Sequence, residues 1–340
     1  MIKTRVLAVD ADQPDAEAIA EAAAALAQGG LVAFATETVY GLGAVATDAA
    51  AVGRIFEAKG RPSFNPLIVH VSGIDQARAF AGAWPDAAQR LAEAFWPGPL
   101  TLVVPKTAAI PHNVTAGGPT VGLRVPAPQV ARALIARVGL PLAAPSANRS
   151  NRISPTRAEH VLADLDGRID LILDSGPTAV GLESTVLNLA SDPPTILRPG
   201  PIGLDDLAPL VDGLGPRARE VAEARRLASP GMLPTHYAPR TRAVRVETAD
   251  RLAEIAWPER AGLLALAPFD PGLIPSTVGR LELVDPIAAA RGLYAALRVL
   301  DERELDLIVV LMPPAGREWE ALRDRLTRAT VSDAPYRSGC

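Results

Sequence analysis

The stretch between residues 36 and 70 constrains the fold of this chain more than any other. Two apolar runs of strand length bracket it, at residues 31–35 and 67–71, and we expect both to be buried strands of one sheet. Between them the pattern predicts a helix over residues 48–58, with Asp48 as its N-cap and Gly60 ending it. The chain therefore returns to the sheet through one short turn.

That turn is basic and stiff, and it reads Lys-Gly-Arg-Pro-Ser-Phe-Asn-Pro over residues 59–66. Prolines follow Arg61 and Asn65, and proline pushes the residue before it toward extended backbone. Lys59, Arg61, Asn65 and His70 are thus held on a short piece of chain, which suits a polyanion such as a triphosphate. The alternative is a solvated basic turn that only closes a helix.

Length and composition narrow the class of protein. A chain of 340 residues predicts about two domains, and 49% hydrophobic with 21% charged residues is typical of a globular protein. Cys340 is the single cysteine, which excludes an intramolecular disulfide, and four scattered histidines indicate no metal cluster. No apolar run is long enough to span a membrane and no signal peptide is evident, so we expect a cytoplasmic protein that has no membrane partner. A net charge of −4 predicts weak attraction to nucleic acid.

Further polar positions lie beside predicted strands. Arg124 lies in the short strand 121–125, either as an edge residue or paired structural cation, or as a clamp for a carboxylate or phosphate. A run of hydroxyls, amides and cations at 145–154 follows an apolar strand, where open α/β sheets bind ligands. The alternative makes Ser154 or Thr156 the N-cap of a following helix. Taken alone, Ser184 is a turn residue and Arg198 a surface cation.

The chain divides into a first domain at 1–205, a linker at 206–240 and a C-terminal domain at 241–340. The linker carries three prolines and a glycine over 229–239, and Tyr237 within it suggests a lid as well as a connection. From residue 244 onward short apolar strands alternate with helices, including one over 249–257, which predicts a parallel sheet. That domain holds no glycine-rich nucleotide motif.

These motifs together resemble the long, two-domain threonylcarbamoyl-AMP synthases, whose catalytic part is a YrdC-like domain. The matching pieces occur in order over residues 1–239: 36–42, 59–62, 65–67, 146–148, 181–185, 198–201 and the linker 229–239. The resemblance implies an α/β fold, with a YrdC-like twisted mixed sheet followed by a smaller Rossmann-like parallel α/β domain. It implies a nucleotidyltransferase that joins L-threonine, bicarbonate and ATP into threonylcarbamoyl-AMP and pyrophosphate, for threonylcarbamoyladenosine in tRNA.

The resemblance also assigns roles to residues. Catalysis falls to Lys59, Arg61, Ser146 and Asn148. The ATP site comprises Lys59, Arg61, Asn65, Thr120, Ala144, Ser146, Ser154, Arg198 and Tyr237. The L-threonine site comprises Thr38, His70, Arg124 and Ser184. No protein nucleophile is needed, because catalysis comes from holding two anions in line among fixed cations.

The implied partners follow from the reaction. ATP is a substrate and carries Mg²⁺ with it, since no cage of paired carboxylates is evident. A threonylcarbamoyl transferase that acts on tRNA receives the product, and a weak direct contact with RNA is one further expectation. Three alternatives are an RNA-binding module, a carbamoyltransferase of the hydrogenase-maturation type, and a C-terminal domain that only regulates or docks.

Overall fold

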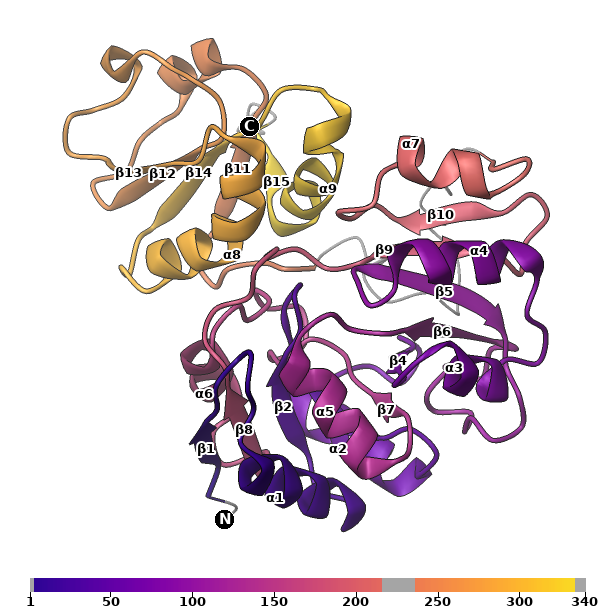
Figure 1. Cartoon of the computed structure of the whole chain (residues 1–340). Helices are drawn as coiled ribbons and strands as arrows, with labels where there is room; N and C mark the ends of the chain where they lie inside the picture. The colour runs from indigo at the N-terminus through magenta and orange to yellow at the C-terminus, as the bar shows by residue number, and fades with distance from the viewer. Residues whose placement is uncertain (1–2, 216–235, 334–340) are drawn as a thin grey trace. The chain divides into compact units, whose positions relative to one another are not determined.

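The computed structural model describes residues 3–215 and 236–333, which form two compact units (Figure 1). Among these described residues, unit 1 comprises 3–150 and 154–215, and unit 2 comprises 151–153 and 236–333. Among the described residues, no helix combines the length and the apolar character needed to span a membrane.

Unit 1 is built on a mixed sheet of ten strands in the order β1-β8-β2-β3-β7-β4-β6-β5-β9-β10. The sheet contains parallel pairs such as β4 with β6 and antiparallel pairs such as β2 with β3, which confirms the predicted mixed sheet. The strands are β1 Arg5–Ala8, β2 Val32–Ala35, β3 Tyr40–Val45, β4 Ile68–His70, β5 Leu100–Pro105, β6 Thr120–Arg124, β7 Leu142–Ala143, β8 Leu171–Asp174, β9 Thr185–Asn188 and β10 Thr195–Arg198.

Helices cover both faces of this sheet. The described helices of unit 1 are α1 Ala16–Ala27, α2 Ala49–Lys59, α3 Ile74–Phe80, α4 Asp86–Phe95, α5 Gln129–Val138, α6 Ala158–Leu165, α7 Leu204–Leu207 and the 3₁₀ turn η1 Ala208–Leu210. Successive strand residues point to opposite faces, so Val32 and Phe34 of β2 pack against α1 and α5, whereas Ala33 faces the core that contains α2 and α6.

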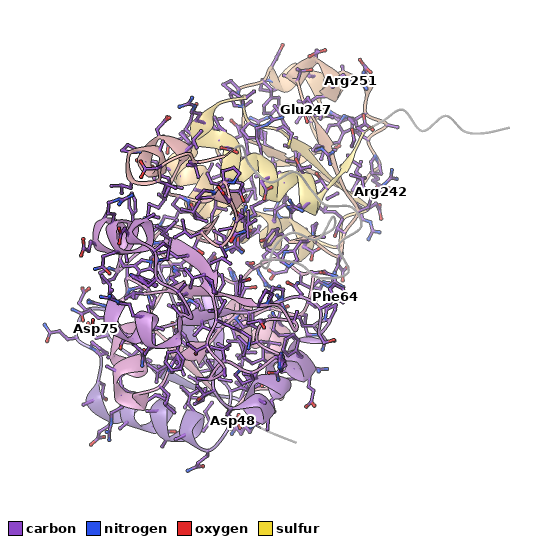
Figure 2. All side chains as sticks on the ribbon, turned by 90° about the vertical axis from the view of Figure 1, so that its right-hand side faces the viewer. Asp48, Phe64, Asp75, Arg242, Glu247 and Arg251 are labelled. Atoms are coloured by element: carbon purple, nitrogen blue, oxygen red, sulfur yellow. The ribbon has the colours of Figure 1, made fainter. Side chains whose placement is uncertain are left out.

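Helix α2 follows the sequence expectation closely. The Asp48 carboxylate accepts the amide N–H groups of Ala50 and Ala51, at 2.9 and 3.1 Å. Gly60 adopts a left-handed conformation with φ of +62°, and it ends the helix as predicted. Figure 2 marks Asp48 at the start of α2 and Phe64 in the turn after its end. The basic turn of residues 59–66 is therefore anchored by a capped helix on one side and by β4 on the other.

The segment after β10 packs into the core of unit 1. The linker was expected to start at residue 206, but Leu207 and Val211 are buried in the core of unit 1 against α4, β5, β9 and β10. The apolar side chains at these positions make the segment part of the unit, and the linker residues 216–235 lie outside the described residues.

Unit 2 contains a five-stranded sheet in the order β13-β12-β14-β11-β15, in which every pairing is parallel, as predicted. Its strands are β11 Ala243–Val246, β12 Ala261–Ala265, β13 Gly279–Glu282, β14 Leu307–Leu311 and β15 Val331–Ser332. Its helices are α8 Pro286–Asp301 and α9 Glu320–Ala329, with the 3₁₀ turns η2 Ala249–Glu254, η3 Pro271–Leu273 and η4 Arg317–Trp319.

The helix expected over 249–257 is instead the 3₁₀ segment η2. The Trp257 indole donates to the carbonyl of Leu252 at 3.1 Å, which folds the end of this segment back on itself. That contact closes the turn where an α-helix would have continued.

Candidate functional site

The basic turn and the loop after β7 meet at the side chain of Lys59. Its ammonium donates to the carbonyl of Ser146 at 2.6 Å and to the carbonyl of Asn148. In return, the amide of Ser150 donates to the carbonyl of Lys59 at 2.9 Å. Two motifs far apart in the sequence thus become one structure. Lys59 is only 2% exposed, so the interpretation as a solvated turn is wrong.

Burial also changes the charge balance at Lys59. Loss of water lowers the pKa of its ammonium well below the usual value, the neighbouring charge of Arg61 lowers it further, and Asp164 opposes both. A cation held in this state gains from an anionic ligand, because the ligand restores the stability of the charged form. The electrostatics of this turn therefore favour binding of a polyanion.

Arg61 and Asn65 form the second half of the turn. The guanidinium of Arg61 donates to the carbonyls of Asn65 and Pro66, at 3.1 and 2.9 Å. The Asn65 side chain is 1% exposed, and both its amide nitrogen and its amide oxygen lack a hydrogen-bond partner among the described residues. A buried amide with unused donors and acceptors is costly unless a ligand or water satisfies it.

The loop 145–154 is held against neighbouring strands by its backbone. Ala147 donates to the carbonyl of Tyr40 at 2.8 Å, and Ala144 donates to that of Ile68 at 2.9 Å. The Ser154 hydroxyl donates to the buried carboxylate of Glu183 at 2.7 Å. The N-cap interpretation of Ser154 and Thr156 is wrong, because α6 begins after residue 157 without a side-chain cap.

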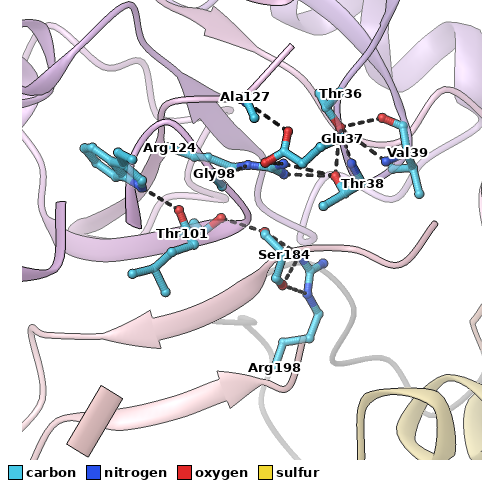
Figure 3. Close-up of polar contacts among 12 residues, drawn as sticks. Thr36, Glu37, Thr38, Val39, Gly98, Thr101, Arg124, Ala127, Ser184 and Arg198 are labelled. Carbon is cyan, nitrogen blue, oxygen red and sulfur yellow. Dashed lines mark hydrogen bonds and ion pairs between the residues drawn. The ribbon is translucent and has the colours of Figure 1, made fainter. Parts of the chain in front are cut away.

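A second polar cluster surrounds Arg124 at the end of β6 (Figure 3). Its guanidinium donates to the Thr38 hydroxyl from both terminal nitrogens at 3.1 Å, and to the carbonyl of Gly98 at 3.2 Å. One of those nitrogens lies 2.8 Å from Glu37 Oε1 in an ion pair. β6 lies between β4 and β5, so Arg124 is a paired, buried cation and the interpretation as an edge residue is wrong.

This arrangement limits how Arg124 can hold a ligand. Three of its five N–H groups donate to Thr38 and Gly98, and one of the two terminal nitrogens also lies in the ion pair with Glu37. A ligand carboxylate on this guanidinium therefore competes with Thr38 and Glu37. The sequence pattern contained no sign of this competition.

Ser184 lies next to this cluster at the start of β9 and is fully buried (Figure 3). Its hydroxyl lies 2.8 Å from the Thr101 hydroxyl and receives a hydrogen bond from Arg198 at 3.1 Å. Arg198 also donates twice to the Ser184 carbonyl, at 3.1 and 2.9 Å. Arg198 is 4% exposed, so the interpretation as a surface cation is wrong.

His70 is the register partner of Arg124 in the parallel pair β4–β6. Burial, the largest cause, and the positive charge of Arg124 lower the pKa of its imidazole to about 3, while a hydrogen bond with the backbone of Ile68 raises this pKa slightly. The ring is therefore neutral at pH 7. Its Nδ1 atom has no hydrogen-bond partner among the described residues, so it has capacity left for a ligand.

Two further residues were predicted for the nucleotide site. Thr120 is half-buried at the start of β6, opposite Pro105 of β5. Tyr237 belongs to unit 2, where its ring is 1% exposed, stacks on Tyr294 at 5.7 Å between centroids and lies 5.4 Å from the guanidinium carbon of Arg325. The lid role of Tyr237 stays a prediction.

Sequence reasoning missed Glu37, Thr101 and Glu183. Glu37 lies beside the predicted Thr38 in the motif, so a search for the partner of Arg124 could have found it. Thr101 carries no signal, because a threonine in an apolar strand is ordinary. Among the described residues, no group of three or more His, Cys, Asp or Glu side chains is arranged to hold a metal ion.

Comparisons with known families cover almost the whole chain. Residues 24–200 match the Sua5–YciO–YrdC family, described as "Telomere recombination". Residues 202–331 match the family described as "Threonylcarbamoyl-AMP synthase, C-terminal domain". Both polar clusters described above lie within the first match.

Individual relatives agree with this. The chain is 42% identical over 327 residues to the threonylcarbamoyl-AMP synthase of Bacillus subtilis, covering 92% of both chains. It is 40% identical over 299 residues to that of Pyrococcus abyssi, covering 85% of this chain and 86% of the relative. The crystal structure of P. abyssi Sua5 complexed with L-threonine superposes with a TM-score of 0.87 at 36% identity, covering 97% of this chain and all of that one.

Proposed function

The chain belongs to the threonylcarbamoyl-AMP synthase family, and from that membership we propose how unit 1 performs the family's reaction. The reaction joins L-threonine, bicarbonate and ATP into threonylcarbamoyl-AMP and releases pyrophosphate. The chain is thus a nucleotidyltransferase that serves threonylcarbamoyladenosine modification of tRNA.

The observation that carries the site assignment is the anchoring of Lys59 on the carbonyls of Ser146 and Asn148. It brings the basic turn to the loop 145–154, so cations, hydroxyls and amides converge on one place in unit 1. Lys59 and Arg61 bind the phosphates, and the unsatisfied amide of Asn65 is the neutral donor beside them. Ser146, Asn148, Ser154, Ala144, Thr120 and Arg198 complete the nucleotide side.

The cluster around Arg124 takes L-threonine. Arg124 holds the α-carboxylate through its terminal N–H groups and exchanges a contact with Thr38 when the ligand arrives. Ser184 provides a second hydroxyl contact, and Nδ1 of the neutral His70 ring accepts a hydrogen bond from the threonine hydroxyl. Valine lacks this hydroxyl and would leave the buried Nδ1 acceptor of His70 without a partner, which explains the choice of threonine.

Ser154 and Glu183 connect the two sides, because Glu183 directly precedes Ser184 in the chain. The threonine amine forms a C–N bond to carbon dioxide supplied by bicarbonate, and it releases a proton. A carbamate oxygen then attacks the α-phosphorus, and the P–O bond to the β-phosphate breaks as pyrophosphate leaves. Unit 1 contributes by fixing both anions in line and neutralising their charge.

The remaining assignments concern partners outside unit 1. Among the described residues no group of three or more His, Cys, Asp or Glu side chains is arranged to hold a metal, so Mg²⁺ would arrive on the ATP phosphates. The product passes to a transferase that acts on tRNA, with at most weak direct RNA contact, in the cytoplasm. Tyr237 is the residue we propose to cover the nucleotide.

The direct test is to incubate the full chain with ATP, bicarbonate and isotope-labelled L-threonine and to identify products by mass spectrometry. The expected product is an adenylated, carbamoylated threonine formed together with pyrophosphate. Arg54→Ala is a matched control, because Arg54 pairs with Asp170 away from both clusters, and it is expected to form product normally. A chain that consumes no ATP unless carbamoyl phosphate replaces bicarbonate would refute the assignment.

A further inference from the structure

Glu37 is a buried carboxylate that the proposed reaction does not use. It is 7% exposed, and its Oε1 atom forms the ion pair with Arg124 at 2.8 Å (Figure 3). Among the described residues, no donor is aligned to give that oxygen a regular hydrogen bond. Taking a charge out of water is expensive, so a carboxylate kept here needs a reason beyond packing.

The protein backbone fixes the position of Glu37. Its second carboxylate oxygen accepts the amide N–H of Ala127 at 3.0 Å, and its main-chain carbonyl accepts the amide of Val180 at 2.8 Å. Glu37 therefore cannot move far when Arg124 exchanges partners. Any ligand that binds Arg124 meets a fixed negative charge beside it.

Glu37 offsets the positive charge of Arg124 within this subsite, and His70 carries no charge at pH 7. Arg124 therefore already has a counter-charge before any ligand binds. A ligand with both a carboxylate and an ammonium group matches this pair better than a simple anion does.

We propose that Glu37 determines specificity: by pairing with Arg124 it offsets the charge of that guanidinium, so that the subsite accepts a zwitterionic α-amino acid and rejects a simple carboxylate anion. The carboxylate and ammonium of an α-amino acid are attached to the same carbon. A carboxylate on Arg124 therefore brings the ammonium close to Glu37, whereas an anion without an amine meets Glu37 uncompensated. This inference rests on the proposed assignment of Arg124 to the α-carboxylate.

The test compares L-threonine with 3-hydroxybutanoate, which has the same carbon skeleton and hydroxyl but no amine, by calorimetry on the full chain without ATP. In the wild-type chain 3-hydroxybutanoate should bind at least about 10-fold more weakly than L-threonine, the scale expected for one uncompensated charge in a buried site. Equal affinities would overturn the proposal without any variant.

Variants identify the responsible residue. Glu37→Gln keeps the size of the side chain and an oxygen for the Ala127 amide, but it removes the charge; we expect the preference for L-threonine to fall about 10-fold or more. Glu37→Asp keeps the charge and should keep the preference even if both affinities drop. Glu21→Gln is the matched control. Glu21 lies on α1 in an exposed ion pair with Arg5, and its replacement should change neither affinity.

The outcomes separate the inference from its premise. If Glu37 only held Arg124 in place, Glu37→Gln would weaken both ligands by the same factor, which would contradict the proposed role in specificity. Arg124→Gln should weaken both ligands together. If Arg124→Gln left L-threonine binding intact, the subsite assignment itself would be wrong, whatever the result for Glu37.

Discussion

Gly200 follows β10 directly after Arg198 and Pro199, and replacing it with alanine should damage the amino-acid subsite without touching any proposed ligand contact. A Cβ at this position would lie 2.3 Å from the Thr185 amide nitrogen, 2.6 Å from the Ser184 carbonyl carbon and 2.8 Å from the Glu183 carbonyl oxygen. All three are backbone atoms, so no side chain can rotate away. The start of β9 must shift instead.

The size of the effect follows from that geometry. Forcing a methyl group into a packed region costs about 1–3 kcal/mol of unfolding free energy. For a unit of this size we expect Gly200→Ala to lower the melting temperature by about 2–10 °C. Because Ser184 and Arg198 are held by that same backbone, we expect affinity for L-threonine to fall about 10-fold while affinity for ATP changes much less.

The assay pairs thermal unfolding with calorimetric titration of L-threonine and ATP. Gly53→Ala is the matched control: it lies inside α2, a Cβ there meets nothing within 4 Å, and it should leave stability unchanged or raise it by up to about 1 kcal/mol. A Gly200→Ala chain with wild-type melting temperature and L-threonine affinity would show that the close approach to Ser184 has no role.

Three further predictions address individual side chains. Lys59→Ala and Arg61→Ala should each lower pyrophosphate release by about 10²-fold or more, the scale of losing one donor to the transition state, and near-normal release would refute the phosphate contacts. Thr101→Val removes the hydroxyl that contacts Ser184 and should raise the KM for L-threonine about 5-fold with kcat nearly unchanged. Thr101→Ser keeps a hydroxyl and should keep the KM of the wild-type chain. The pKa of His70 is about 3 in the folded chain against about 6.5 when unfolded, so the unfolded state binds the extra proton. His70 should therefore lower the unfolding free energy by about 1.4 kcal/mol for each pH unit that the pH falls between about 6.5 and about 3. Denaturation of His70→Asn, measured between pH 5 and 7, should lack this contribution.

Local features of the fold could be predicted from the sequence, because their causes are local. The Asp48 cap and the end of α2 at Gly60 depend on a side chain and a backbone conformation within a few residues. The parallel sheet of unit 2 follows from the regular alternation of strand and helix. The predicted linker start at residue 206 differs from the observed packing, because burial of Leu207 depends on strands that come much earlier in the chain.

The polar site shows where such reasoning ends. The sequence allowed two interpretations of Arg124: an edge residue or paired structural cation, and a ligand clamp. Its ion pair with Glu37 joins residues 87 positions apart, so the pairing is seen only in the folded sheet. The same holds for Ser154, whose bond to Glu183 competes with the local capping role that the pattern suggested. Long-range pairing determined each outcome, and a linear pattern does not encode it.

The most direct test of the central claim is the structure of the full chain crystallised with L-threonine and a non-hydrolysable ATP analogue. We expect phosphate oxygens about 3 Å from the side-chain nitrogens of Lys59 and Arg61, and the threonine carboxylate at the same distance from Arg124. We also expect the threonine amine to lie close to Glu37. Nucleotide bound in unit 2, or threonine bound away from Arg124 and Ser184, would contradict the claim that unit 1 brings both substrates together.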